Sequence, residues 1–270
     1  MNRKYYTYLV RVQYLGFRFH GWQKQPNVKT LQEMIEKTFR YIFEKKPFKI
    51  LGASRTDAMV SANHAAFELF MREPIDEAET LKAFNYNLPQ DLRALELYEI
   101  KDPDFNIIQH SKQKEYVYLF SFGEKPHPFS APFMTYVREP LDIGLMKKGA
   151  KLYEGTHNFL RFCKKPNGMT QLVRTIDECE IVPNELYQAS FFPEESYLFR
   201  VKASGFLRNQ IRLMVGALFD LGCGALTLEE LETALKGETG EMISVIAPAS
   251  GLILNEVEFE QSPNKELSVS

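Results

Sequence analysis

Residues 48–58 of the chain read Phe-Lys-Ile-Leu-Gly-Ala-Ser-Arg-Thr-Asp-Ala and join a short apolar run to a polar loop. The run from Phe48 to Leu51 is typical of a strand. In the loop, Arg55 precedes Asp57 by two residues, and a nearby cation favours the ionised form of a carboxylate. Asp57 is therefore a candidate nucleophile or base. Considered alone, however, an Arg-x-Asp sequence is more often a loop ion pair of little energetic consequence.

The residues around this loop predict a β-α-β-β-α-β order. Strands are indicated by alternation of apolar and polar residues, and helices by a capping residue followed by apolar residues at helical spacing. The first helix is expected to continue until Pro47 stops it. Such an order is typical of a ferredoxin-like half, in which helices back an antiparallel sheet. Predicted strands are residues 6–14, 48–51, 63–70 and 92–100, and predicted helices start at Thr30 and Asp76.

A second half of the same kind follows the polar, proline-containing segment 101–104. We therefore expect an N-terminal domain over residues 1–104, a C-terminal domain over 105–260, and a flexible tail over 261–270. The predicted fold class is α+β, with two ferredoxin-like, RRM-like halves whose antiparallel sheets are flanked by helices. Predicted strands in the second half are 116–122, 175–182 and 197–203, and predicted helices are 142–153, 207–221 and a short one opened by Thr227.

The composition limits the function classes. The chain has a formal net charge of −2 and three widely spaced cysteines without a Cys-x-x-Cys pair, so it predicts neither a disulfide framework nor a zinc site. Its five histidines are scattered, and we expect no metal. No run of about 18 apolar residues or signal-like segment is present. These features indicate a cytoplasmic protein that is not associated with a membrane.

A negative net charge does not indicate nucleic-acid binding, so any RNA site must be a local cluster of basic residues. Aromatic residues interleaved with such cations permit base stacking together with phosphate contact. Each cluster is equally compatible with an ordinary solvated surface. The candidates are Arg18 and Lys24 around Trp22, then Arg161, Lys164 and Lys165 beside Phe159 and Phe162, and finally Arg208 with Arg212 on the predicted helix 207–221.

Several motifs in one order resemble the TruA-type tRNA pseudouridine synthases. The resemblance covers nearly the whole chain and implies two domains around a positively lined catalytic cleft, a homodimer that lets RNA span both subunits, and a reaction without cofactor, metal or ATP. The implied substrate is tRNA, at uridines 38 to 40 of the anticodon arm. The motifs are residues 14–25, 53–64, 87–89, 116–118, 155–159, 174–176, 205–224 and 248–252.

The resemblance assigns roles to individual residues. Asp57 matches the catalytic aspartate, which either attacks the sugar or base or abstracts a ribose proton. Tyr116 matches an active-site tyrosine that packs against the uracil, and Arg212 an arginine that pairs with the aspartate. Leu252 matches an apolar residue of the uracil pocket, and Arg55 an arginine that holds the flipped nucleotide. Further substrate contacts are expected from Arg18, Trp22, Lys24 and Arg208.

The chain also departs from the family pattern. The family usually has glycine and histidine where this chain has Met59 and Ser61, and arginine is common where Val117 stands. A divergent paralogue with another RNA target, or a noncatalytic RNA-binding protein of the same fold, therefore remains an alternative. A glycoside hydrolase would need a second placed carboxylate, which no motif supplies. The sequence also lacks the phosphate-binding loop of nucleotide-driven enzymes.

Overall fold

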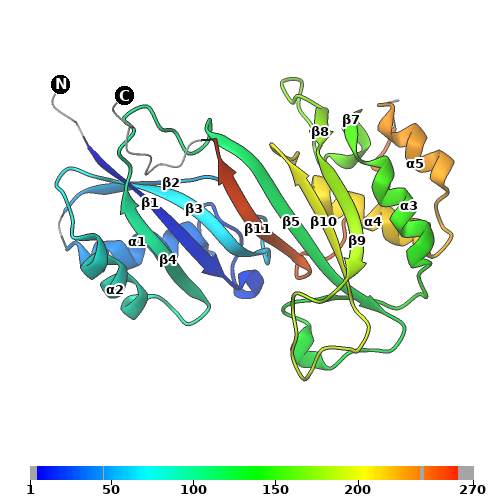
Figure 1. Ribbon diagram of the computed structural model, residues 1–270, viewed down its shortest axis with the longest axis horizontal. Coiled ribbons are helices and arrows are strands. Elements are labelled where there is room, and N and C mark those ends of the chain that lie inside the picture. The colour runs from blue at the N-terminus through cyan, green and yellow to red at the C-terminus, as the bar shows by residue number, and fades with distance from the viewer. Residues whose placement is uncertain (1–4, 45, 238–239, 261–270) are drawn as a thin grey trace, which may run out of the picture. The chain divides into compact units, whose positions relative to one another are not determined.

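The computed structural model describes residues 5–44, 46–237 and 240–260 (Figure 1). These residues form two compact units. The first runs to Lys112 and resumes at Leu254, and the second comprises Gln113–Ile253. The tail expected over 261–270 lies outside the described residues. Within the described residues, no helix is long and apolar enough to cross a membrane.

The first unit contains a largely antiparallel sheet. Its order is β4 (Leu92–Glu99), β1 (Tyr6–Tyr14), β3 (Ser61–Met71) and β11 (Leu252–Phe259, from Leu254 onward in this unit), while β2 (Phe48–Gly52) pairs with the far end of β3. β1 lies between β4 and β3, and its side chains at Tyr8, Val10 and Val12 are buried. The four strands predicted for this half are confirmed, and β11 is a strand that the sequence did not reveal.

Two helices pack on the sheet of the first unit: α1 (Leu31–Ile42) and α2 (Glu77–Asn87). The side chain of Thr30 accepts a hydrogen bond from the N–H of Glu33, and so caps α1 as its sequence predicts. Phe39 of α1 stacks on Phe84 of α2 with ring centroids 4.2 Å apart. The helix ends at Ile42, earlier than expected, because Glu44 has a left-handed φ of 54° and does not continue it.

The strands of the second unit, which we call the second sheet, pair antiparallel in the order β5 (Ser111–Phe122), β10 (Tyr197–Ala203) and β9 (Glu178–Pro183), with β6 (Thr135–Val137) parallel to β5. A separate two-stranded hairpin consists of β7 (Gly155–Asn158) and β8 (Val173–Ile176). The single strand predicted over 175–182 is thus wrong. The chain changes partner at Asp177, and alternation alone carries no information about which strand is the neighbour.

Two helices, α3 (Ile143–Leu152) and α4 (Gln210–Gly222), pack on one face of this second sheet, and α5 (Leu228–Leu235) packs against α3. Phe219 of α4 contacts Tyr118 and Phe120 of β5 edge to face. α4 begins three residues later than predicted because Asn209, with φ of 60°, does not continue a right-handed helix. Arg208 therefore does not lie on the helix that carries Arg212, contrary to the sequence prediction.

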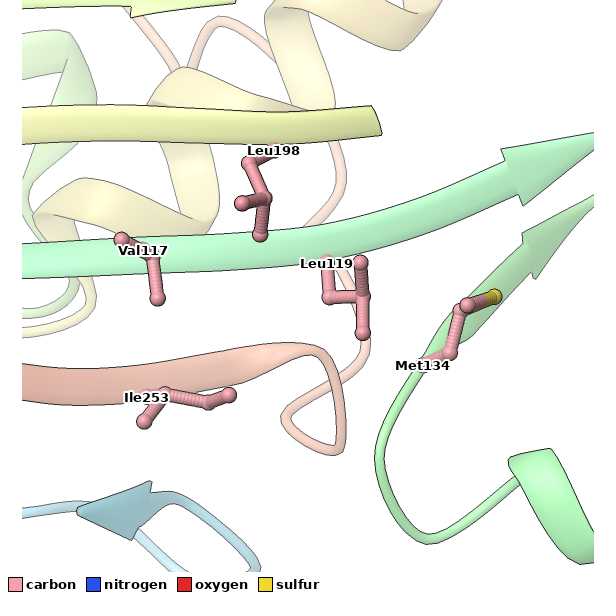
Figure 2. Packing of buried hydrophobic residues seen from close by; sticks show 5 residues of the cluster. All are labelled: Val117, Leu119, Met134, Leu198 and Ile253. Carbon is pink, nitrogen blue, oxygen red and sulfur yellow. The ribbon is translucent and has the colours of Figure 1, made fainter. Parts of the chain in front are cut away.

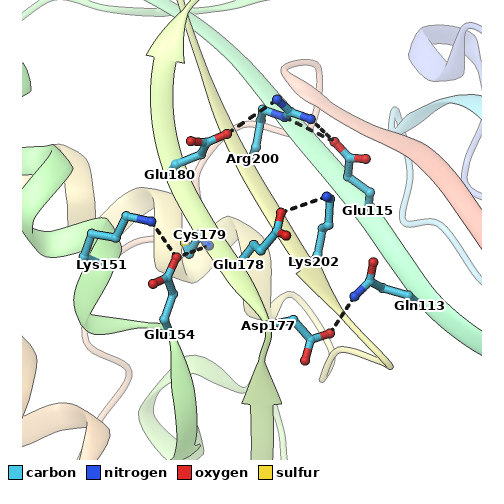
Figure 3. A network of polar contacts seen from close by, with 10 residues as sticks. All are labelled: Gln113, Glu115, Lys151, Glu154, Asp177, Glu178, Cys179, Glu180, Arg200 and Lys202. Carbon is cyan, nitrogen blue, oxygen red and sulfur yellow. Dashed lines mark hydrogen bonds and ion pairs between the residues drawn. The ribbon is translucent and has the colours of Figure 1, made fainter.

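The other face of the second sheet is apolar at one end and charged at the other. Figure 2 shows the apolar end, where Val117, Leu119, Met134, Leu198 and Ile253 form a buried cluster. At the charged end, ion pairs run from strand to strand across β5, β10 and β9 (Figure 3). Side chains at even positions of β5 point to the helices instead. Three short 3-10 helices complete the described structure at Gly16–Arg18, Pro128–Ser130 and Leu160–Phe162.

The α+β class predicted from the sequence is confirmed. Each unit has an antiparallel sheet with helices on it, and local sequence signals account for most of these elements. Asp76 caps α2 by accepting from the N–H of Glu79. Thr227 and Glu230 form a reciprocal capping box at α5, the arrangement that the sequence of this segment indicates.

Candidate functional site

Asp57 lies in a loop of the first unit that is fixed through its backbone. The N–H of Trp22 donates to the carbonyl of Thr56 at 3.1 Å, and the N–H of Met59 donates to the carbonyl of Phe19 at 2.9 Å. The Thr56 hydroxyl is also hydrogen-bonded to the hydroxyl of Tyr14 at 2.9 Å. Asp57 is half-buried between these anchored residues. Its position is therefore set by the segment 14–22, which carries the first of the motifs.

Two glycines allow this segment to approach the loop closely. A Cβ at Gly16 would collide with the carbonyl of Val60, and a Cβ at Gly21 would lie 2.7 Å from the carbonyl oxygen of Thr56. Gly21 also has a φ of 87°, which side chains with a Cβ rarely adopt. Backbone contact at this distance is possible only for glycine, so both positions shape the Asp57 loop.

The two flanking positions of the loop are exposed. Arg55 is exposed, and the ion pairs among the described residues do not include one between Arg55 and Asp57. Met59 has a left-handed φ of 67°, and its side chain is 36% exposed. The structure thus explains why a glycine is usual at the position of Met59, since this backbone conformation is strained for most residues.

In the second unit, Tyr116 and Tyr118 face the helices from alternate positions of β5. Tyr116 packs edge to face on Phe206 with centroids 5.4 Å apart. The hydroxyl of Tyr118 donates to the carbonyl of Pro248 at 2.7 Å and is hydrogen-bonded to Thr135 at 2.8 Å. Burial raises the pKa of Tyr118, while the hydrogen bond to Thr135 and the positive charge of Arg212 act in the opposite direction. Arg212 therefore lies close to Tyr118.

Arg212 is held by the segment that leads to Leu252. Its Nε donates to the carbonyl of Ala247 at 2.6 Å, and the Ala247 N–H donates back to the Arg212 carbonyl at 3.1 Å. Further along, the Leu252 N–H donates to Ala249 at 3.0 Å, and Leu252 is only 5% exposed. Two of the predicted site residues thus meet at one segment of the second unit, since residues 247–252 bind Arg212 and contain Leu252.

Tyr118 was missed by sequence reasoning, although it connects these residues. Its hydroxyl fixes Pro248, one residue after the partner of Arg212. Gly251 supports the same turn, since a Cβ there would lie 2.6 Å from the carbonyl of Leu119. The signal was present in the alternation of tyrosines at 116 and 118, which places both side chains on one face of a strand.

Three candidate RNA contacts around the aromatic loop have other partners in the structure. Arg18 donates from Nη2 to the carboxylate of Asp91 at 2.7 Å, and Lys24 is 3.5 Å from the carboxylate of Glu36. Trp22 is only 4% exposed, and its indole packs where a Cβ at Gly52 would lie. This burial leaves no open face of Trp22 for base stacking.

The second predicted basic cluster also differs from its expected form. Phe159 and Phe162 are completely buried, so they cannot stack on bases beside Lys164 and Lys165. Arg208 is exposed in the turn before α4. Among the described residues, no group of three or more His, Cys, Asp or Glu side chains is arranged to hold a metal ion.

Comparison with known proteins places these features in a class. Residues 11–107 and 150–260 match the family described as tRNA pseudouridine synthase, a class of isomerases that convert uridine to pseudouridine in RNA. The chain belongs to this family, and tRNA is the kind of partner that the family implies.

The similarity to curated relatives extends over almost the full length of this chain. A tRNA pseudouridine synthase A of Exiguobacterium sibiricum is 34% identical over 251 residues, which are 93% of this chain and 96% of the relative. A tRNA pseudouridine synthase A of Shouchella clausii is 30% identical over 93% of this chain and 92% of its own. A protein named tRNA pseudouridine synthase A 2 of Bacillus anthracis is 33% identical over 94% of this chain and 99% of its own.

Proposed function

We propose that the chain isomerises uridine to pseudouridine at positions 38 to 40 of the tRNA anticodon arm, with Asp57 as the catalytic carboxylate. The observation that carries this assignment is the Asp57 loop. Its backbone is anchored at Thr56 and Met59, while Arg55 beside it is exposed. An enzyme that must keep one carboxylate in a fixed position, and leave a cation free to meet RNA, needs this combination.

The reaction breaks the bond between C1′ of the ribose and N1 of uracil, rotates the base, and forms a bond between C1′ and C5. The proton on C5 is lost and N1 gains one, so no oxidant or reductant is required. Asp57 acts either as the nucleophile or as the base that removes a ribose proton. Tyr116 packs on the base and accepts the C5 proton, Leu252 lines the base, and Arg212 and Arg55 supply positive charge to the substrate.

The released C5 proton provides the assay. Tritium release from an unmodified tRNA transcript labelled at C5 of uridine should occur with the wild-type chain and be abolished in Asp57→Asn. This variant keeps the size of the side chain and removes its charge. Retained turnover in Asp57→Asn would remove Asp57 from the catalytic role. Binding without release in the wild type would favour a noncatalytic RNA-binding protein.

The uridine that is modified has to be mapped, because two features favour a paralogue with another target. Met59 and Ser61 replace the family's usual glycine and histidine beside Asp57, and one relative carries the name tRNA pseudouridine synthase A 2. Transcripts in which the uridines at 38, 39 and 40 are replaced by cytidine should lose tritium release. Undiminished release from such a transcript would assign the enzyme to a different position.

We further propose that the protein acts as a homodimer in the cytoplasm. The family resemblance supports the dimer. The three cysteines, of which Cys163 and Cys179 are buried and unoxidised, are compatible with a reducing compartment. Light scattering coupled to size-exclusion chromatography would give twice the chain mass of 31.3 kDa for the dimer. A mass of one chain at micromolar concentration would contradict the proposal.

A further inference from the structure

The hairpin of the second unit carries an unusual concentration of positive charge. We call residues 155–176 the basic arm: β7, the 3-10 helix Leu160–Phe162, a long connecting loop, and β8 (Figure 1). It contains Arg161, Lys164, Lys165 and Arg174 and no aspartate or glutamate, although the whole chain has a net charge of −2. Positive charge is thus concentrated locally in a protein that is acidic overall.

The arm is a defined structure that lies outside the larger sheet. Among the described strands, β7 and β8 form a two-stranded sheet of their own, and His157 lies opposite Arg174. Within the loop, Asn167 and Thr170 are joined by reciprocal hydrogen bonds. Met169 at the tip of the loop is 94% exposed. The arm therefore presents an ordered surface to the solvent.

Cations from different parts of the second unit converge at the base of the arm. The N–H of Lys164 donates to the carbonyl of Arg208 at 3.1 Å, which brings the turn before α4 against the arm. Burial raises the pKa of the Cys163 thiol, and the charges of Arg174 and Arg208 both oppose this rise. The two guanidinium groups thus both lie near the same buried sulfur.

These cations lack the acidic partners that several other cations of the described structure have. Arg11, Lys151 and Lys202 lie within 2.8, 2.7 and 2.7 Å of a carboxylate. Over the residues that the structure describes, no carboxylate lies within 4.0 Å of the charged groups of Lys164, Lys165, Arg174 or Arg208. The Arg174 side chain donates to the carbonyl of its neighbour Val173 at 2.9 Å. Clustered cations without a carboxylate partner do not have to break an ion pair before they bind the phosphates of a polyanion.

The arm is also connected to the proposed site residues of its unit. Arg161 donates to the carbonyl of Glu241 at 3.0 Å, and its own carbonyl accepts from the N–H of Ile243. The segment that starts there ends at Ala247, which is hydrogen-bonded to Arg212. RNA bound along the arm would therefore lead toward the residues that receive the base.

We propose that the basic arm, together with Arg208, binds the phosphate backbone of tRNA outside the nucleotide that is isomerised. The inference rests on the proposed function only for the identity of the RNA. Its chemical basis is general, since phosphate neutralisation by lysine and arginine releases counterions and makes the affinity depend on salt. Lys164 and Lys165 supply compact charges, while Arg174 and Arg208 supply planar guanidinium groups suited to phosphate oxygens.

The test compares two pairs of adjacent lysines in the same unit. Lys164→Gln/Lys165→Gln removes two charges from the arm, and Lys147→Gln/Lys148→Gln removes two exposed charges from α3. Fluorescence anisotropy with a labelled, unmodified tRNA transcript gives Kd over a range of salt concentrations. For the arm variant, the slope of log Kd against log salt should fall by about 2 and Kd at 0.15 M salt should rise roughly 10- to 30-fold. The α3 variant should behave as wild type.

Equal losses in both variants, or no change in the arm variant, would overturn the proposal. If the arm variant unfolds at a lower temperature, the single change Lys165→Gln, at the exposed lysine, replaces it with an expected slope change of about 1. Tritium release by the wild type is measured in parallel. Tritium release by the wild type together with an unchanged salt slope in the arm variant would refute the proposed role of the basic arm alone. A changed salt slope without tritium release would refute the proposed reaction and leave the role of the basic arm in place.

Discussion

Gly21→Ala should inactivate the enzyme by moving Asp57, although residue 21 is not itself a site residue. The added Cβ would lie 2.7 Å from the carbonyl oxygen of Thr56 and 3.2 Å from the carbonyl carbon of Asp57. All of these neighbours are backbone atoms, so the loop itself has to shift. The change also forces a residue with a Cβ into a left-handed conformation, which costs about 1–2 kcal/mol.

Gly123→Ala separates the two effects. Gly123 has a φ of 82°, close to the 87° of Gly21, but a Cβ there would meet nothing within 4 Å. The control therefore has the conformational cost without the collision. A displacement of about 1 Å at a catalytic group can lower the rate roughly 100-fold. We expect Gly21→Ala to lose about that factor in kcat and Gly123→Ala to remain within about twofold of wild type.

The assay is tritium release at saturating tRNA, with the thermal unfolding of each variant measured separately. The conformational cost alone should lower Tm by roughly 2–8 °C in both variants. The reasoning is refuted if Gly21→Ala, folded at the assay temperature, turns over as fast as Gly123→Ala. Equal rates would mean that the Asp57 loop accommodates the Cβ without displacement of its carboxylate.

Three further substitutions test a buried carboxyl group, a buried hydroxyl group and a helix cap. Burial raises the pKa of Glu68 to about 7, against an opposing hydrogen bond from Ile107. Ionisation of this carboxyl therefore lowers the stability of the fold as the pH rises from about 4.5 through 7. Glu68→Gln should raise Tm at pH 8 more than at pH 5, and an equal rise at both pH values would contradict this. Tyr118→Phe leaves the Pro248 carbonyl without its donor and should cost about 1–3 kcal/mol, with a higher KM for tRNA; an unchanged Tm would show that another group replaces the hydroxyl. Thr227→Ala removes a capping box and should cost about 1 kcal/mol by denaturant unfolding, whereas turnover should not change.

Local signals in the sequence were enough to place most of the fold. Thr30, Asp76 and Thr227 cap the helices that they were predicted to cap, because a cap and the first helical turn involve adjacent residues. What failed depends on partners distant in sequence. β11 has no distinctive alternation, and the change of partner at Asp177 leaves no trace in the periodicity of the chain.

The residues of the candidate site were predicted only in part, and from the family resemblance instead of from local sequence signals. Asp57, Tyr116 and Arg212 were singled out through a family resemblance, and spacing alone would have left Arg212 as a surface residue. Trp22 shows the limit of composition, since an aromatic residue among cations was expected to stack on bases and instead packs over Gly52. Whether an aromatic side chain is buried depends on the neighbouring strand, which residues 14–25 do not specify.

The chain order of the two units has a consequence for biosynthesis. β11 adds to β3 in the first unit, yet it is made only after the entire second unit. Until residue 259 has left the ribosome, the part of the β3 edge that β2 does not cover is unpaired, and such an edge is prone to pair with another nascent chain. A product that terminates before β11 would carry the Asp57 loop on an incomplete sheet. Premature termination should therefore yield an aggregating polypeptide, and translation must reach the last strand before the catalytic loop has a finished support.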